Sequence, residues 1–168
     1  MELACDYERS AQLLSSKIGH ESASSLLKVL AFEIGLKATY LYHHSKLPTA
    51  TGGRGHDYWS IWNEIPAEAR EAIIDCGRDR FAGHVSLGEP EKVLKELQNC
   101  FSKGRYSYEK NLERTQEEVA RVSREWLENG SLEGQADFQY FPMERDALFH
   151  GIRAYLETKL GISFHLDS

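Results

Sequence analysis

The chain has 168 residues, of which 41% are hydrophobic and 27% are charged, and its formal net charge is −6. These values are typical of one globular domain with a complete hydrophobic core. The acidic balance excludes a protein that coats nucleic acid through a broad basic face, although a nuclease that grips a few phosphates is compatible with it.

Targeting and redox signals indicate the cytoplasm. The chain begins without the basic start and apolar run of a signal peptide, and no apolar run approaches the roughly 20 residues of a membrane span. The cysteines Cys5, Cys76 and Cys100 are odd in number and lack metal-ligand spacing, so a disulfide framework is not expected. We therefore expect a cytoplasmic protein with no membrane partner, no metal and no cofactor.

The first part of the chain predicts two helices, over residues 6–17 and residues 21–42. The second of these is apolar nearly all round, which is typical of a central, buried helix. Within it, Glu33 and Lys37 are four positions apart, so we expect their side chains to pair.

The middle of the chain is expected to alternate short helices with loops, because prolines and glycines punctuate it at short intervals. The expected segments are a loop over residues 45–55, an aromatic helix over residues 56–65 that stops at Pro66, a helix over residues 67–76 ended by Gly77, a loop over residues 78–88, and a helix from Pro90 to about residue 108.

The last part of the chain combines a charged segment with a final helix. Residues 111–129 carry a thin apolar stripe and predict an amphipathic helix that lies on the rest of the domain or on a partner. Residues 130–142 predict a loop, in which residues 138–141 have the composition of a short strand. The last helix is expected over residues 143–160, with Gly161 as its cap.

No internal repeat and no linker divides the sequence. The expected architecture is therefore a single domain over residues 1–168. It is all-α, an antiparallel up-down helical bundle of four main helices plus short accessory helices.

The start of the last helix carries the main candidate site, formed by Arg145, Asp146 and His150. Asp146 and His150 share a helical face, so the carboxylate can accept a hydrogen bond from the imidazole and orient it. Arg145 lies about 140° around the helix from His150 and would flank the same groove. An oriented acid/base beside a permanent cation suits chemistry on a phosphodiester. The alternative is that Arg145 and Asp146 are solvated first-turn residues and that His150 packs against a neighbour.

Four other groups of residues are candidate sites. Arg105 and Tyr108 can stack on a nucleobase and are candidate substrate-binding residues. The remaining groups have simpler interpretations as solvated or flexible segments, because their spacing fits no ligand set. They are Arg78 with Asp79 and His84 in an expected loop, the histidines His43, His44 and His56, and the segment Gly52-Gly53-Arg54-Gly55.

Four segments spread over residues 5–160 resemble HEPN domains (higher eukaryotes and prokaryotes nucleotide-binding). The last of them is similar to the signature of that family, an Arg, a polar residue, and a His after four to six intervening positions. The segments are Ala31-Phe32-Glu33-Ile34-Gly35-Leu36-Lys37-Ala38, Gly55-His56-Asp57, residues 101–109, and Arg145-Asp146-Ala147-Leu148-Phe149-His150.

The resemblance implies a homodimer in which two signature helices face each other across a two-fold axis. Active members are metal-independent endoribonucleases of toxin–antitoxin and anti-phage defence systems. By position, His150 would deprotonate the ribose 2′-hydroxyl or protonate the leaving oxygen, and Arg145 would stabilise charge on the phosphate. Asp146 would orient His150 or contact the partner's Arg145.

Three functions are open at this point. An endoribonuclease predicts that Arg145 and His150 are exposed, face a groove and meet their symmetry mates. A non-catalytic HEPN module, which binds a nucleotide or a partner such as a nucleotidyltransferase-type antitoxin, predicts a groove without that geometry or one blocked by neighbouring side chains. A structural interaction protein predicts an exposed apolar stripe through Val119, Val122 and Trp126. We favour the first, because three suitable residue types coincide with the position of the family signature.

Overall fold

The computed structural model describes residues 1–17, 20–48, 56–81, 87–99 and 141–164, together with isolated positions between 115 and 128. Within these residues it contains six helices and no strand, which confirms the predicted all-α class. The helices are α1 (Glu2–Ser15), α2 (Glu21–His44), α3 (Tyr58–Glu64), α4 (Ala67–Arg80), α5 (Pro90–Asn99) and α8 (Pro142–Leu160).

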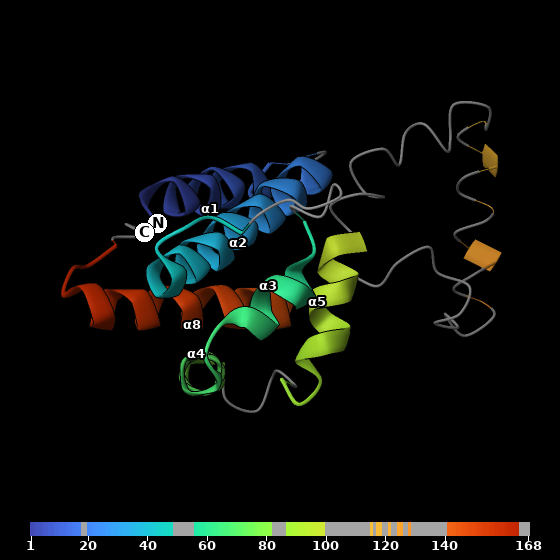
Figure 1. Ribbon diagram of the computed structural model, residues 1–168. Helices are drawn as coiled ribbons and strands as arrows, with labels where there is room; N and C mark the ends of the chain where they lie inside the picture. Colours follow the sequence, from blue (N-terminus) through green and yellow to red (C-terminus); the bar gives the residue numbers. More distant parts are fainter. Residues whose placement is uncertain are drawn as a thin grey trace.

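Helix α2 is the central element, as its apolar composition predicts. Its residues Val29, Phe32 and Leu36 are at most 2% exposed. It packs against α1, α8 and α3, and Figure 1 shows α1 beside it with α8 running along the pair. The Ser24 hydroxyl donates a hydrogen bond to the Ala11 carbonyl at 2.8 Å, which fixes the contact between α1 and α2.

The ends of α8 follow the expected signals, whereas α3 begins at Tyr58, two residues later than expected, and Asp57 is its N-cap. Pro142 occupies the first turn of α8, and Gly161 ends the helix with φ 65°, donating its N–H to the Glu157 carbonyl. The Asp57 side chain accepts a hydrogen bond from the Ser60 N–H at 3.1 Å and caps the start of α3. Helix α1 begins at Glu2 rather than at residue 6, because Ala4 and Cys5 already pack into the interior.

The prediction that Gly77 ends a helix is wrong, because α4 continues to Arg80. Gly77 is buried against α8, and a Cβ at this position would lie 2.7 Å from the Ala147 carbonyl oxygen. On α8, a Cβ at Gly151 would lie only 2.0 Å from the Ile73 carbonyl oxygen. The two glycines therefore serve close helix contact, and their missing side chains let the backbones of α4 and α8 approach.

Several sequence predictions fall outside the described residues. They concern the loop at residues 49–55, the helix beyond Asn99, the strand at residues 138–140, the candidate residues Arg105 and Tyr108, and most of the amphipathic helix at residues 111–129, including Val119, Val122 and Trp126.

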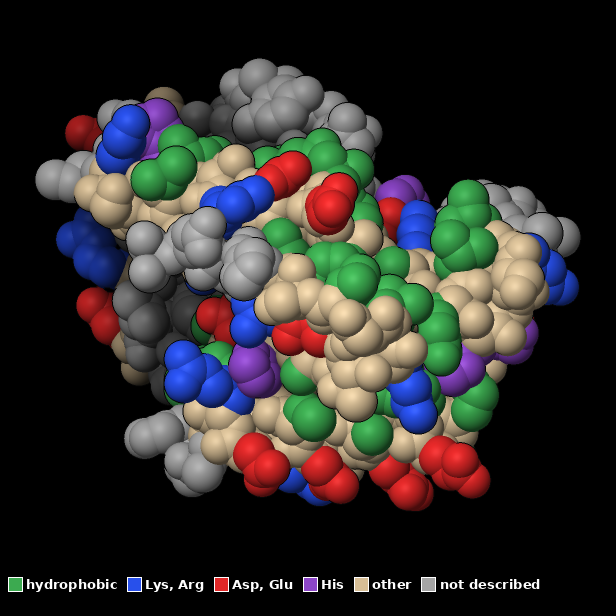
Figure 2. Space-filling model, turned by 90° about the vertical axis from the view of Figure 1, so that its left-hand side faces the viewer, with side chains coloured by type: hydrophobic (Ala, Val, Ile, Leu, Met, Phe, Trp, Pro, Cys, Tyr) green, Lys and Arg blue, Asp and Glu red, His purple; other side chains and the backbone are tan. Residues whose placement is uncertain are grey.

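The outer surface of α4 is acidic. Glu68, Glu71, Asp75 and Asp79 recur at helical spacing and are all exposed. Figure 2 shows Asp and Glu side chains in a row along the lower edge of the molecule, where Figure 1 places α4. No helix in the described ranges has the length and apolar character needed to cross a membrane.

Replacing Gly151 by alanine tests the contact between α4 and α8. Because the added methyl group would overlap the Ile73 carbonyl, we expect the free energy of unfolding to fall by about 3 kcal/mol. Gly161→Ala is the matched control, since its Cβ meets nothing within 4 Å and only the left-handed backbone costs about 1 kcal/mol. Urea denaturation measures both variants, and equal losses would contradict the assigned contact.

Candidate functional site

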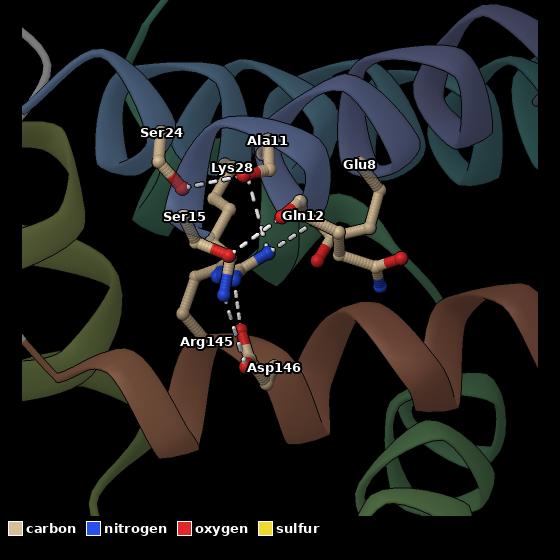
Figure 3. Close-up of polar contacts among 8 residues, drawn as sticks. All are labelled: Glu8, Ala11, Gln12, Ser15, Ser24, Lys28, Arg145 and Asp146. Atoms are coloured by element: carbon tan, nitrogen blue, oxygen red, sulfur yellow. Dashed lines mark hydrogen bonds and ion pairs between the residues drawn. The ribbon is translucent and has the colours of Figure 1, made fainter. Parts of the chain in front are cut away.

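Arg145 lies in the interior of the protein, at the junction of α1, α2 and α8 (Figure 3). Its side chain is 0% exposed, and its Nη1 donates a hydrogen bond to Glu8 Oε2 at 2.7 Å. The same nitrogen is 3.4 Å from the Lys28 carbonyl oxygen. Glu8 is itself buried, so the pair joins the first helix to the last in surroundings that hold little water.

Asp146 supplies a second carboxylate to the same guanidinium. Its Oδ1 forms an ion pair with Arg145 Nη2, and its Oδ2 lies 3.7 Å from Lys28 Nζ. The four side chains of this cluster, Glu8, Lys28, Arg145 and Asp146, carry two positive and two negative charges. Balanced charge is what a buried ionic cluster requires, because an unpaired ion would lose its hydration without compensation.

His150 lies apart from this cluster. It is partly buried, and its ring meets the Phe81 ring edge-on with centroids 6.5 Å apart. Burial, together with the positive charges of Arg153 and Arg80, lowers the pKa of His150 from its ordinary value. The imidazole is therefore neutral near pH 7, a form that can accept a proton.

The arrangement of these three residues differs from the sequence predictions. Arg145 is neither solvated nor part of an open groove, because α1 covers it. The expected hydrogen bond from His150 to Asp146 is not formed between these two described residues, since the Asp146 carboxylate faces Arg145 and Lys28. The structure thus brings Arg145 and Asp146 together and places His150 against the end of α4.

A second polar cluster surrounds Glu33 on α2. The expected pair with Lys37 is confirmed, with Lys37 Nζ 2.6 Å from Glu33 Oε1. The other carboxylate oxygen, Oε2, lies 2.7 Å from the Tyr58 hydroxyl and 2.7 Å from His56 Nδ1. Burial by itself raises the pKa of Glu33, but the hydrogen bonds from Lys37, Tyr58 and His56 outweigh it and hold the pKa below the ordinary value. Two of the segments that resemble the HEPN family therefore meet at one buried carboxylate.

Sequence reasoning missed one partner in each cluster, Glu8 for Arg145 and Tyr58 for Glu33. Glu8 stands on the apolar face of α1 with Ala4 and Ala11, and an acid in that position was the available signal of a buried cation elsewhere. The sequence gives no sign of the hydrogen bond from the Tyr58 hydroxyl to Glu33, because an aromatic residue at the start of α3 is expected to pack in the hydrophobic core. Neither partner is adjacent in sequence to the residue that it contacts.

The structure does not bring the other described candidate residues from the sequence together into a site. Arg78, Asp79 and Arg80 belong to the last turn of α4 rather than to a loop, and His84 is outside the described residues. His43 and His44 point to different partners, Tyr155 and the Glu64 carbonyl. Among the described residues, no group of three or more His, Cys, Asp or Glu side chains is placed to hold a metal ion.

Comparisons with known proteins return no relative. No protein-family model matches the chain, and neither a curated protein nor a solved structure matches it. The HEPN resemblance therefore stays a prediction that depends on the four quoted segments.

Substitution of Arg145 tests its role in holding α1. Arg145→Met leaves the Glu8 carboxylate buried without its cation, so we expect a loss of about 3–5 kcal/mol in the free energy of unfolding. The double variant Glu8→Gln/Arg145→Met should recover part of this loss. Lys95→Met is the control, because its ion pair with Glu91 is exposed and contributes less than about 1 kcal/mol. A loss of stability in Arg145→Met no larger than in this control would contradict the structural role.

The lowered pKa of Glu33 makes a prediction about acid stability. Because the folded-state pKa is below the unfolded one, ionised Glu33 stabilises the fold above the unfolded pKa, and this contribution is lost as the pH falls through the folded pKa. Glu33→Gln should lower the free energy of unfolding by about 2 kcal/mol at pH 7 and flatten its decline below about pH 5. Urea titrations from pH 7 to pH 3 measure this, with the exposed Glu91→Gln as control. A Glu33→Gln profile parallel to that of the wild type would contradict it.

Proposed function

We propose that this chain is a HEPN-like helical domain that binds a nucleotide or a partner protein and does not use Arg145 to cleave RNA. The observation that carries the proposal is the complete burial of Arg145 against Glu8. A catalytic cation must reach the phosphate oxygens of its substrate, and Arg145 could reach them only after α1 had separated from α8. The blocked position of Arg145 is what a non-catalytic member of such a family predicts.

The surface charge supports the same proposal. The acidic row of α4, formed by Glu68, Glu71, Asp75 and Asp79, lies on the helix that packs against α8. A nucleic-acid strand that lay along this row would meet negative charge, which opposes binding driven by phosphate neutralisation. Only the end of α4 nearest His150 is basic, through Arg78 and Arg80. A small ligand or a partner protein does not carry a continuous row of phosphates, so the acidic row repels it less than it repels a nucleic-acid strand.

One observation favours a second candidate, a metal-independent endoribonuclease of a toxin–antitoxin or defence system centred on His150. The lowered pKa of His150 leaves a neutral imidazole, and the charges that contribute to it come from Arg153 and Arg80. In this second candidate, Arg153 and Arg80 would stabilise charge on the phosphate, the role that the sequence resemblance gave to Arg145. A homodimer would place two such histidines at one groove, and its partner would be the corresponding antitoxin.

Cleavage of a mixed set of tRNA and mRNA in EDTA separates the two candidates. We expect no cleavage by the wild-type protein, because its last helix presents His150 without an accessible Arg145. The same assay is run on His150→Ala and Arg80→Ala, each checked for helix content and oligomeric state by circular dichroism and light scattering.

Cleavage by the wild type that disappears in a folded His150→Ala variant would overturn the binding proposal and establish the second candidate. If cleavage were also lost in Arg80→Ala, Arg80 would be the cation that stabilises the phosphate. Cleavage that persists in His150→Ala is a contaminating activity, and a repeat on protein purified in a second way removes it.

A further inference from the structure

A pocket of about 530 Å³ lies at the end of the protein away from Arg145. It is bounded by the last turn of α2, by α4 from its start to Cys76, and by the last turns of α8. Tyr155 lies ten positions after Arg145 on α8, so about 15 Å of helix separates the two sites. The volume falls in the range of small-molecule sites, about 300–1,000 Å³.

Aromatic rings form one wall of this Tyr155 pocket. The rings of His43 and Tyr155 are stacked at 27° with centroids 5.9 Å apart, and Tyr155 Oη lies 3.0 Å from His43 Nε2. Burial, His44 and Lys159 lower the pKa of His43, so the imidazole is uncharged near neutral pH. Tyr42 meets His43 edge-on and is 40% exposed. The exposed Tyr42 ring, beside the uncharged His43–Tyr155 stack, suits a flat aromatic ligand.

Opposite charges flank this wall. Lys159 Nζ lies 5.6 Å from the centroid of the Tyr155 ring. On the α4 side, Glu68 raises the pKa of Tyr155, in addition to the larger effects of burial and of Tyr42. Within the described part of the chain, neither Lys159 nor Glu68 takes part in an ion pair, so both charges are available to a ligand.

We propose that the Tyr155 pocket binds a small flat aromatic molecule that carries one anionic group and one amino group. The ring packs on the exposed ring of Tyr42 beside the His43–Tyr155 stack, the anion pairs with Lys159, and the amino group donates a hydrogen bond to Glu68. This inference rests on the binding role proposed above and names its site and ligand chemistry. An aromatic amino acid and a purine nucleoside monophosphate both have this chemistry.

Isothermal titration calorimetry with two matched series of probes tests the proposal. Tryptophan is compared with tryptamine, which lacks the carboxylate, and with indole-3-acetate, which lacks the amino group. AMP is compared with adenosine, which lacks the phosphate. Each probe is titrated into the wild type, Lys159→Met, Glu68→Gln and the control Lys17→Met, whose lysine is exposed after α1 at the opposite end of the bundle.

We expect tryptophan or AMP to bind, and Lys159→Met to weaken that binding at least tenfold while Lys17→Met leaves it unchanged. The probe without an anion should bind Lys159→Met and the wild type equally, and indole-3-acetate should bind Glu68→Gln and the wild type equally. Binding of tryptophan without AMP identifies an amino-acid ligand, and the reverse identifies a nucleotide.

Failure of every probe to bind, or binding that both pocket variants leave unchanged, overturns the pocket. That result leaves the proposed function standing, because the proposed function is tested separately. It fails only if the protein cleaves RNA through His150, whatever the pocket binds. Both pocket substitutions replace exposed side chains, so a folded protein is expected, and circular dichroism verifies it.

Discussion

The position of α1 depends on one buried cation. Arg145 cannot be hydrated where it lies, so a carboxylate must approach it from the element that covers it, and Glu8 does so from α1. Asp146 adds the second negative charge and in turn approaches Lys28 on α2. Three helices are thereby held at one point by charge neutralisation, while apolar packing stabilises the remainder of their length. A residue that resembles a catalytic arginine in sequence thus acts as an internal support.

Different parts of α8 make different contacts. Its first turn belongs to the Arg145 cluster, and its middle is held close to α4 by the missing side chains of Gly77 and Gly151. These close backbone contacts set the position of α8 on α4. The last turns of α8 place Tyr155 and Lys159 across the pocket from Glu68 on α4.

The sequence predicted the all-α class, the buried character of α2 and the extent of α8, because apolar periodicity and end signals are local properties. The pair of Glu33 with Lys37 was predictable for the same reason. The role of Gly77 was predicted wrongly. The sequence alone does not distinguish a glycine that ends a helix from a glycine inside a helix that lets a second helix approach closely. The surroundings of Arg145 were misread too, because helical spacing to His150 says nothing of what covers the first turn. Glu8 and Tyr58 came from elements whose placement only the folded chain decides.

The separation of 137 positions between Glu8 and Arg145 has a consequence for how the chain acquires its structure. Helix α1 is synthesised before α8, and the cation that neutralises its buried acid is made 137 positions after Glu8. Until then the Glu8 carboxylate must stay in water, and the apolar face around it cannot be buried without a penalty. Contacts this distant in sequence form slowly, since a large loop has to close first. We therefore expect α1 to dock after α2 and α8 have formed, although it is synthesised before them.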